Sequence, residues 1–500
     1  MRAPSSRLLA LALPALALSA CSMAPAYRVP TTVAIPPQFK EEPGWAVASP
    51  SDAVARGAWW DLFRDPVLDD LERRVEVTNQ NVASYRAAYL AARGLVQVQR
   101  SALFPTLDLS ASGTHSKTFE GQTVSGGTGA TTTVTGAAVS RYSLSIGASW
   151  EPDLWGRLGN TLSQAKASAQ ASAGDLANAT LSAQGELATN YVQLRGIDAQ
   201  RVLLDRTVAD YTRALTITTN KYHAGTVSRA DVFQAQTTLS NAQATRADLD
   251  RQRAVLEHAI AVLVGENPST FALAPVDWQP VVPDIPAQVP AALLQRRPDI
   301  AAAERRVAAA NANVGIQKAA YFPQVSLSGS VGTNSSVLSQ LFQAATSLWS
   351  LGVSGAMTLL DFGARHGAVV QARAQYDQTV ATYRQTVLTA FQQVEDNLAG
   401  TRVLAQVAQR RTEATTAAAQ AETITNNQYR NGIVDYTSVI TAQTAALSAR
   451  QTEIQSVIDR QTAAIALAQA VGGRWSDQSP APGAAAPASG APASGTPPQE

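Results

Sequence analysis

A stretch of sixteen residues that occurs twice is the feature that most restricts how this chain can fold. Residues 221–236 read KYHAGTVSRADVFQAQ and residues 428–443 read QYRNGIVDYTSVITAQ, with six identical positions at an offset of 207 residues. Further upstream, residues 99–110 match residues 317–328 at an offset of 218 residues. A unit of roughly 200 residues is therefore repeated, and such a repeat sets the architecture before any single residue does.

The positions of proline predict where the long helices of each unit lie. Proline lacks a backbone N–H and clashes with the preceding turn, so helix interiors exclude it. No proline lies within residues 153–267 or within residues 324–479. We therefore expect one helix over about 156–222 and another over about 365–429, each roughly 100 Å long at about 1.5 Å per residue.

Each long helix is predicted to end in a tight turn. Gly225 and Gly432 occupy equivalent positions of the repeat, and glycine commonly follows the last helical residue in a left-handed conformation. Helical sequence resumes a few residues later in both copies. The repeated sixteen residues thus predict the tips of two helical hairpins, at about 223–228 and about 430–436.

Each unit also contains two segments in which apolar and polar residues alternate, which is a strand signal. The segments lie at about 105–116, 140–151, 322–332 and 348–358. Strands of about ten residues, with aromatic ends and a small, almost uncharged polar face, favour a membrane barrel over the half-buried sheet of a soluble domain. Four strands are too few to close a barrel. Two, three or four copies of the chain would therefore have to share one.

Composition argues against several classes of function. Charged residues make up 15% of the chain and the net charge is +1, whereas a protein that binds nucleic acid needs a basic patch. The four histidines are scattered without the spacing of metal ligands, so we expect no metal site. No nucleophile motif or carboxylate pair stands out, so we expect no enzyme and assign no catalytic residue.

The N-terminus is predicted to be a signal peptide over residues 1–20. Two arginines precede an apolar run at 8–18, which is too short to span a bilayer as a helix. Leu-Ser-Ala then precedes Cys21, the only cysteine of the chain, in an order similar to the processing site of bacterial lipoproteins. We expect cleavage before Cys21 and a lipid on its thiol; the alternative is an ordinary signal peptide with an incidental cysteine. By resemblance to Gram-negative lipoproteins, Ser22 after the cysteine favours the outer membrane.

Three segments occur in an order typical of one protein family. Residues 21–30 read CSMAPAYRVP, residues 59–71 read WWDLFRDPVLDDL, and residues 293–327 include QRRPDI and YFPQVSL. They resemble the TolC-like outer-membrane factors, in particular the lipoprotein branch (NodT/OprM-like) of tripartite efflux systems. The resemblance implies an α+β membrane protein and a homotrimer. Each chain would give four strands to a shared 12-stranded outer-membrane β-barrel, continuous with a long periplasmic α-helical barrel.

The resemblance also implies an order of parts along the chain. These are a signal peptide (1–20), a lipidated N-terminal segment of an equatorial belt (21–66), the first repeat (67–265), a Pro-rich equatorial linker (266–290), the second repeat (291–475) and a disordered tail (476–500). The first pair of strands encloses a Gly- and Thr-rich segment, 121–136, which we expect to face the exterior.

In function, the family implies a passive exit duct for drugs or other small toxic compounds. Energy would come from an inner-membrane RND-type transporter, connected through a periplasmic adaptor that docks on the helical tips. No cofactor is implied beyond the lipid on Cys21, and no nucleic acid. Two alternatives stay open: a type I protein secretion duct, and a structural periplasmic lipoprotein without a pore.

Residues at the tips are the predicted gate. In the family, an Asp of the first hairpin bonds a Tyr of the second, and Asp231 and Tyr429 occupy these positions. The family's tip arginine falls on Val434, so one link is missing. Its pore-facing aspartates fall on Ser438 and Thr441. The chain therefore departs from the family where selectivity is usually set.

Asp435 is near enough to these positions along the turn to supply an acidic ring in place of the family's aspartates. Three copies close to an axis would attract cations; equally, Asp435 can cap the returning helix, and the two roles are compatible. The family's hydrophobic constriction falls on Thr437. The gate candidates are Arg229, Asp231, Tyr429, Asp435, Tyr436, Thr437 and Thr441. The expected adaptor-docking residues are Gly225, Val227, Gly432 and Val434.

Overall fold

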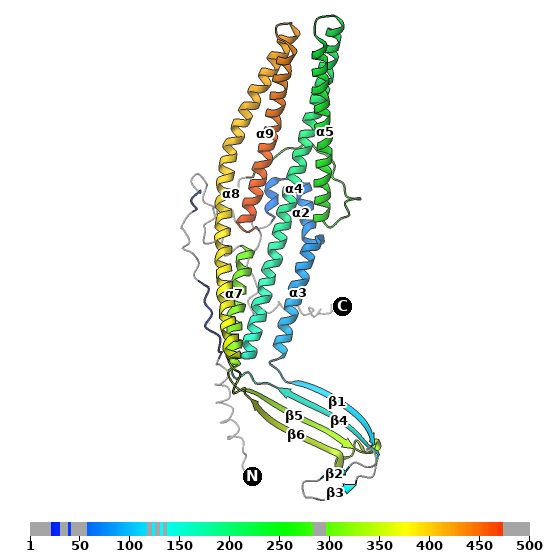
Figure 1. Cartoon of the computed structure of the whole chain (residues 1–500), viewed down its shortest axis with the longest axis vertical. Coiled ribbons are helices and arrows are strands. Elements are labelled where there is room, and N and C mark those ends of the chain that lie inside the picture. Colours follow the sequence, from blue (N-terminus) through cyan, green and yellow to red (C-terminus); the bar gives the residue numbers. More distant parts are fainter. Residues whose placement is uncertain are drawn as a thin grey trace, which may run out of the picture.

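A long body of helices with a curved sheet at one end makes up the described part of the chain (Figure 1). The computed structural model describes residues 22–30, 39–41, 58–117, 123–125, 131–133, 138–283 and 297–473. The predicted signal peptide, Cys21 and the predicted tail lie outside these residues. The tips of two helical hairpins lie at the end of the body far from the sheet (Figure 1).

The two longest helices are α4 (Arg157–His223) and α8 (Ala364–Arg430), with 67 residues each. Both lie where the absence of proline predicts a helix. Each turns back into a helix of 35 residues, α5 (Arg229–Leu263) and α9 (Tyr436–Ala470). Because all four begin and end at the offset of 207 residues, the sequence repeat is also a structural repeat.

Glycine ends both long helices for a backbone reason. Gly225 and Gly432 have φ angles of 73° and 74°, a left-handed conformation that a side chain disfavours. After α4, the N–H of Thr226 donates to the carbonyl of Lys221 at 2.9 Å. This bond satisfies one of the free carbonyls of the last turn, as in a Schellman motif.

Two shorter helices, α3 (Gln80–Ser101) and α7 (Pro298–Ala319), open the two units at the offset of 218 residues. Helix α3 packs on α4, and α7 packs on both α4 and α8. A Cβ on Gly174 of α4 would lie 2.9 Å from the Cβ of Ala302 in α7. Small residues therefore let these helices approach more closely than larger side chains would allow.

The largest hydrophobic cluster lies in the middle of the body. There, the 3-10 helix η2 (Trp59–Phe63) and helix α2 (Pro66–Thr78) contribute buried side chains that pack with those of α4. Asp65 caps α2 by accepting from the N–H of Val67 at 2.9 Å, and it also accepts from the hydroxyl of Tyr191 in α4 at 2.6 Å. One carboxylate thus starts α2 and fixes it on the long helix.

Four antiparallel strands form the sheet, in the order β1 (Thr106–Lys117), β4 (Ala138–Trp150), β5 (Gln324–Ser335) and β6 (Ser347–Ala356). Pairing of β4 with β5 joins the two repeats, since Ile146 of β4 faces Leu109 on one side and Val331 on the other. Strands β1 and β6 are the edges of this sheet. The structure therefore confirms the predicted helix-rich α+β fold.

Segments between the strands hold short elements that the sequence did not predict. A two-stranded hairpin, β2 (Thr123–Ser125) with β3 (Thr131–Thr133), lies in the Gly- and Thr-rich segment. The 3-10 helices η3 (Leu338–Gln340) and η4 (Ala344–Thr346) lie between β5 and β6. Among the described residues, no helix is both long enough and apolar enough to cross a membrane.

Candidate functional site

One small apolar cluster joins all four helices at the tips. Ala235 of α5, Tyr429 of α8 and Tyr436 of α9 are buried in it, and Leu215 of α4 packs against them. The rings of Tyr429 and Tyr436 lie 5.5 Å apart. Burial raises the pKa of Tyr436 to about 12, with the neighbouring Tyr429 as the next cause. The Tyr436 phenol is therefore uncharged near neutral pH.

The returning helices are capped by the same two residue types in opposite order. Ser228 caps α5, and its Oγ and N–H donate to the carboxylate of Asp231, both at 2.9 Å. Asp435 caps α9 by accepting from the N–H of Ser438 at 2.9 Å and from its Oγ at 2.6 Å. These hydrogen bonds lower the pKa of Asp435. The predicted cap role of Asp435 is thus present in the structure.

Asp231 and Tyr429 are not hydrogen-bonded to each other in this chain. The carboxylate of Asp231 is engaged by Ser228 in the capping box. The buried hydroxyl of Tyr429 has no hydrogen-bond partner among the described residues. The link carried over from the family is therefore absent from the tips of this single chain, where Ser228 holds the carboxylate of Asp231.

The other gate candidates lie on the surface of the tips. Asp435, Thr437 and Thr441 are exposed at the start of α9. The guanidinium of Arg229 lies 5.2 Å from the ring centroid of Phe233, one turn along the same helix. These side chains remain accessible on the single chain, whereas Tyr429 and Tyr436 are packed between the hairpins.

The docking candidates form the turns themselves. Gly225 and Gly432 are exposed, and Val227 and Val434 are half-buried. Val434 packs against the apolar cluster of the tips. The surface of the tips therefore combines turn backbone with exposed side chains such as Ile433.

Lys221, which no sequence motif indicates, lies beside Tyr429 in the structure. Its Nζ lies 3.3 Å from the carbonyl oxygen of Tyr429 and 3.8 Å from the centroid of the ring. The only signal in the sequence is a mismatch of the repeat, because Gln428 stands at the equivalent position of the second unit.

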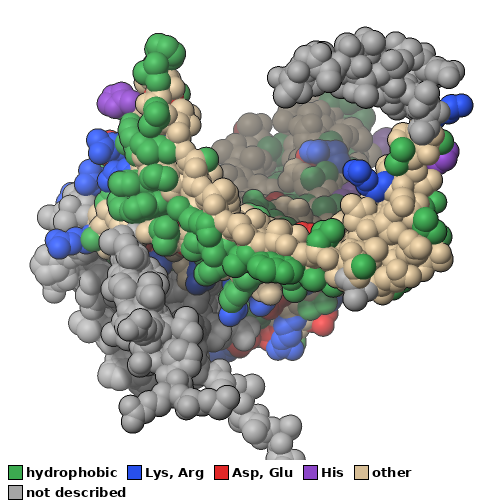
Figure 2. Space-filling view, turned by 90° about the horizontal axis from the view of Figure 1, so that it is seen from below, with side chains coloured by type: hydrophobic (Ala, Val, Ile, Leu, Met, Phe, Trp, Pro, Cys, Tyr) green, Lys and Arg blue, Asp and Glu red, His purple; other side chains and the backbone are tan. Residues whose placement is uncertain are grey.

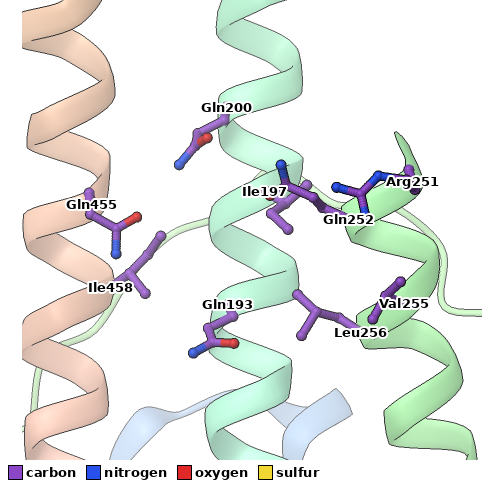
Figure 3. Close-up of a pocket in the computed structure, with 9 residues that line it drawn as sticks. All are labelled: Gln193, Ile197, Gln200, Arg251, Gln252, Val255, Leu256, Gln455 and Ile458. Atoms are coloured by element: carbon purple, nitrogen blue, oxygen red, sulfur yellow. The ribbon is translucent and has the colours of Figure 1, made fainter. Parts of the chain in front are cut away.

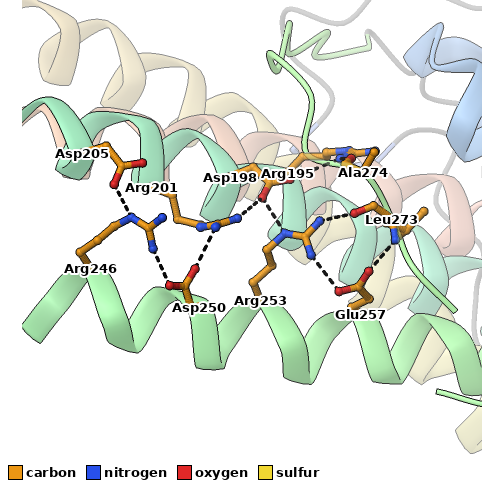
Figure 4. Close-up of polar contacts among 10 residues, drawn as sticks. All are labelled: Arg195, Asp198, Arg201, Asp205, Arg246, Asp250, Arg253, Glu257, Leu273 and Ala274. Atoms are coloured by element: carbon orange, nitrogen blue, oxygen red, sulfur yellow. Dashed lines mark hydrogen bonds and ion pairs between the residues drawn. The ribbon is translucent and has the colours of Figure 1, made fainter. Parts of the chain in front are cut away.

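A ladder of ion pairs joins α4 to α5 farther down the body (Figure 4). The buried carboxylate of Asp198 lies 2.8 Å from Arg253 and 3.3 Å from Arg195. Arg195 also donates to the carbonyl of Ala274, and Arg253 to that of Leu273. Charges buried this deeply need such extra hydrogen bonds to offset their desolvation. The ladder therefore holds the segment after α5 against the body.

A cavity of about 410 Å³ lies beside this ladder, between α4, α5 and α9 (Figure 3). Four glutamines, four aliphatic side chains and Arg251 line it. Arg251 is itself paired with Asp248 at 2.7 Å. The cavity can offer amide hydrogen bonds, but it has no constellation that performs chemistry. Within the described residues, no group of three His, Cys, Asp or Glu side chains could hold a metal ion.

The sheet has one apolar face and one face lined by hydroxyl groups. Hydrophobic side chains gather along the convex side of the curved sheet (Figure 2), and Leu107, Leu109 and Leu351 are more than 70% exposed. On the other face, serines pair across the strands, such as Ser110 with Ser145 at 2.7 Å. The strand surface thus separates an apolar exterior from a polar, mostly neutral interior side.

Residues 22–30 lie against the helices near the sheet. The Oγ of Ser22 donates to the amide oxygen of Asn160 at 3.1 Å, and the amide of Asn311 donates to the carbonyl of Pro25 at 2.9 Å. Asn160 is in the first turn of α4, shortly after β4 ends at Trp150. The residue that follows Cys21 is therefore fixed where the sheet meets the helices.

Known proteins resemble this chain over nearly its whole length. The family model for outer membrane efflux proteins matches residues 72–266 and 289–473, which correspond to the two repeats. The solvent efflux pump outer membrane protein SrpC of Pseudomonas putida is 31% identical over 486 residues, covering 92% of this chain and 97% of that protein. The outer membrane protein OprJ of Pseudomonas aeruginosa is 28% identical, and the match covers 95% of this chain and 98% of that protein.

Solved structures agree with these sequence matches. The outer-membrane channel OprN superposes with a TM-score of 0.82 at 28% identity, covering 91% of this chain and 99% of that one. The MtrE outer membrane channel of Neisseria gonorrhoeae, described in an open state, superposes with a TM-score of 0.78 at 26% identity. The match covers 91% of this chain and 99% of that one. Both repeats and both ends of the body therefore have counterparts in efflux channels. The chain belongs to the outer membrane efflux protein family, as an outer-membrane exit channel of an efflux pump and not an enzyme.

Proposed function

We propose that three copies of this chain assemble into the exit duct, with a 12-stranded barrel to which each copy gives four strands. The observation that carries this proposal is the open sheet. Its edge strands, β1 and β6, run in opposite directions because every pair in the order β1-β4-β5-β6 is antiparallel. The β6 edge of one copy can therefore pair antiparallel with the β1 edge of the next.

The side chains of the sheet support this assembly. An open edge in lipid would leave backbone N–H and C=O groups unpaired, which a closed barrel avoids. The apolar convex face suits contact with lipid, and the serine-lined face suits a water-filled lumen. Apolar side chains also stay exposed along α3, including Leu90, Leu95 and Val98. Neighbouring copies would cover them.

Cysteine pairs across the proposed seam test the assembly. Leu109→Cys in β1, combined with Leu351→Cys or Val353→Cys in β6, covers two registers of the seam. In a Cys21→Ser background, oxidation should produce covalent dimers and trimers on a denaturing gel. The matched control pairs Ile146→Cys with Leu351→Cys, because the inner strand β4 lies away from the seam. Larger ladders than trimers, or none in either register, would contradict a trimer.

We further propose that Cys21 carries a lipid. Ser22, which follows it, is held at the junction of sheet and helices, where a chain on the preceding thiol can enter the adjoining membrane leaflet. The lipid would position the N-terminus, and the barrel would hold the protein in the membrane. Labelling with radioactive palmitate should mark the wild type and leave Cys21→Ser unlabelled.

In the assembled pump, we propose that the tips dock onto a periplasmic adaptor which connects the duct to an RND-type transporter. The exposed turns at Gly225 and Gly432 fit this role, with Val227 and Val434 beside them. Relatives are named for solvent, toluene and antibiotic efflux, which favours drugs and other small toxic compounds as cargo. Deleting the gene should sensitise cells to such compounds, and plasmid-borne wild type should restore resistance.

Gating at the tips completes the proposal. Packing of Tyr429 and Tyr436 between the hairpins keeps the tips together, and the exposed Asp435, Thr437 and Thr441 would face the narrowed opening. Arg229 and Asp231, at the start of α5, would be the gate residues that the first hairpin contributes. A channel in planar bilayers should show low conductance with the tips closed, whereas a structural lipoprotein without a pore would show none.

A further inference from the structure

The tip of α8 is held by a cation from the neighbouring hairpin. Lys221 lies in the last turn of α4, and its Nζ contacts both the carbonyl oxygen of Tyr429, at 3.3 Å, and the face of its ring, at 3.8 Å from the centroid. A single ammonium thus makes a charge-assisted hydrogen bond and a cation–π contact with one residue.

Helix dipoles give this contact a second effect. Helices α4 and α8 end at equivalent positions, His223 and Arg430, so the partly negative carbonyl ends of both lie at the tips. The carbonyl of Tyr429 belongs to the last turn of α8 and already accepts from the N–H of Gly432 at 3.1 Å. The ammonium of Lys221 adds positive charge near both helix ends, where the dipoles favour it.

The two repeats differ at this point. Tyr222 is the counterpart of Tyr429, yet it is 39% exposed and lies beside His223, whereas Tyr429 is 9% exposed. The counterpart of Lys221 is Gln428, which carries no charge. The contact therefore runs in one direction only, from the first hairpin to the second.

We propose that Lys221 is a positioning residue of the gate, a clip that holds the tip of the second hairpin against the first. Releasing this clip frees Tyr429 and the turn at Gly432 to move away from α4. The effect on conductance rests on the proposed duct; the clip itself lies within one chain and does not depend on it.

Replacing Lys221 with Met tests the clip, because Met keeps an unbranched apolar stem and removes the ammonium. Amide hydrogen exchange of the full-length protein should become about three- to tenfold faster over residues 428–436, as expected for losing one such contact. Single-channel conductance in planar bilayers should increase. Lys221→Arg should stay close to wild type in both measurements, since a guanidinium can also lie over the ring and donate to the carbonyl.

A control variant removes a positive charge from the same helix. The variant is Arg213→Met. Arg213 lies two turns before Lys221, and its side chain is 70% exposed and pairs with Asp210 of α4. It should leave exchange and conductance unchanged. Exchange in Lys221→Met equal to wild type would overturn the clip, and faster exchange with unaltered conductance would overturn its role in gating. If wild type forms no channel, the proposed duct fails while the exchange measurement still decides on the clip.

Discussion

At the scale of single residues, Asp435 has two roles that a pair of variants separates. Asp435→Asn should keep the cap, because Asn caps helices as well as Asp does, but it removes the negative charge. If Asp435 lines the pore, the cation preference obtained from reversal potentials in a salt gradient should decrease. Asp435→Ala should in addition speed amide exchange in the first turn of α9. A cation preference that is unchanged in Asp435→Asn would leave the helix cap as the only role of Asp435.

Glu72 is a buried carboxyl that the sequence did not single out. It is fully buried in α2, and neither carboxylate oxygen has a hydrogen-bond partner among the described residues. Burial, and then the nearby Asp69, raise its pKa well above the usual range. Since the folded-state pKa exceeds the unfolded one, its contribution to stability is complete below about pH 4.5 and is lost as pH rises through the folded-state pKa.

Glu72→Leu should therefore raise stability most at high pH. We expect a gain of about 1–3 kcal/mol at pH 8, because an unpaired buried polar group is removed, and a smaller gain at pH 5. Thermal unfolding followed by circular dichroism at both pH values measures this. Glu76→Leu, at an exposed position one turn along α2, is the matched control and should show no such pH dependence. An equal gain in the stability of Glu72→Leu at both pH values would contradict a raised pKa of Glu72.

At the scale of elements, the approach of the N-terminal segment to α7 depends on a glycine. A Cβ on Gly315 would lie 2.6 Å from the Cβ and 2.8 Å from the Cα of Ala24. Gly315→Ala should displace this backbone, at a cost of about 1–3 kcal/mol, and make residues 22–30 more sensitive to protease. Gly94→Ala in α3, where nothing lies within 4 Å, should be neutral or stabilising. Equal protease sensitivity in both variants would show that Gly315 does not fix the segment.

The two hairpins also differ as elements. Between α4 and α5, ion pairs join Arg246 to Asp205 at 2.6 Å and Arg253 to Asp198 at 2.8 Å. Between α8 and α9, Arg450 pairs with Glu422 at 2.9 Å. The repeat predicts equal helix lengths in the two hairpins, but it does not predict equal ion pairs between their helices. Those depend on single charges that the two copies do not share.

At the scale of the whole molecule, the proposed lumen contains two charges that three copies would repeat, those of Asp108 in β1 and of Arg141 in β4, which pairs with Thr114 on the same face. Asp108 of β1 lies opposite Gly147 and shares the hydroxyl-lined face with Ser110. A ring of three such carboxylates would attract cations. Asp108→Asn should therefore lower the cation-to-anion permeability ratio, by about twofold or more. Lys117→Gln, at the far end of the same strand and on its other face, should change the ratio less; an unaltered ratio in Asp108→Asn would place the carboxylate outside the conduction path.

Local sequence patterns are enough to predict the order and length of the main elements of this protein. Proline-free stretches, the glycines after each long helix and the period-two segments act through local backbone geometry, so the helices, turns and principal strands lie close to where they were predicted. The cap at Asp435 was predictable for the same reason, since it involves residues three positions apart. The family followed from short segments of sequence, and the comparisons confirm it.

Contacts between side chains of different elements could not be predicted in this way. The burial of Tyr429 but not of Tyr222, the cation of Lys221 beside it and the capture of Asp231 by Ser228 arise at the tips, where two hairpins some 200 residues apart along the chain come together. The burial of Glu72 likewise depends on how α2 packs with its neighbours. A local pattern fixes the conformation of each element; the free energy of a contact between elements depends on their relative placement, which the repeat does not specify.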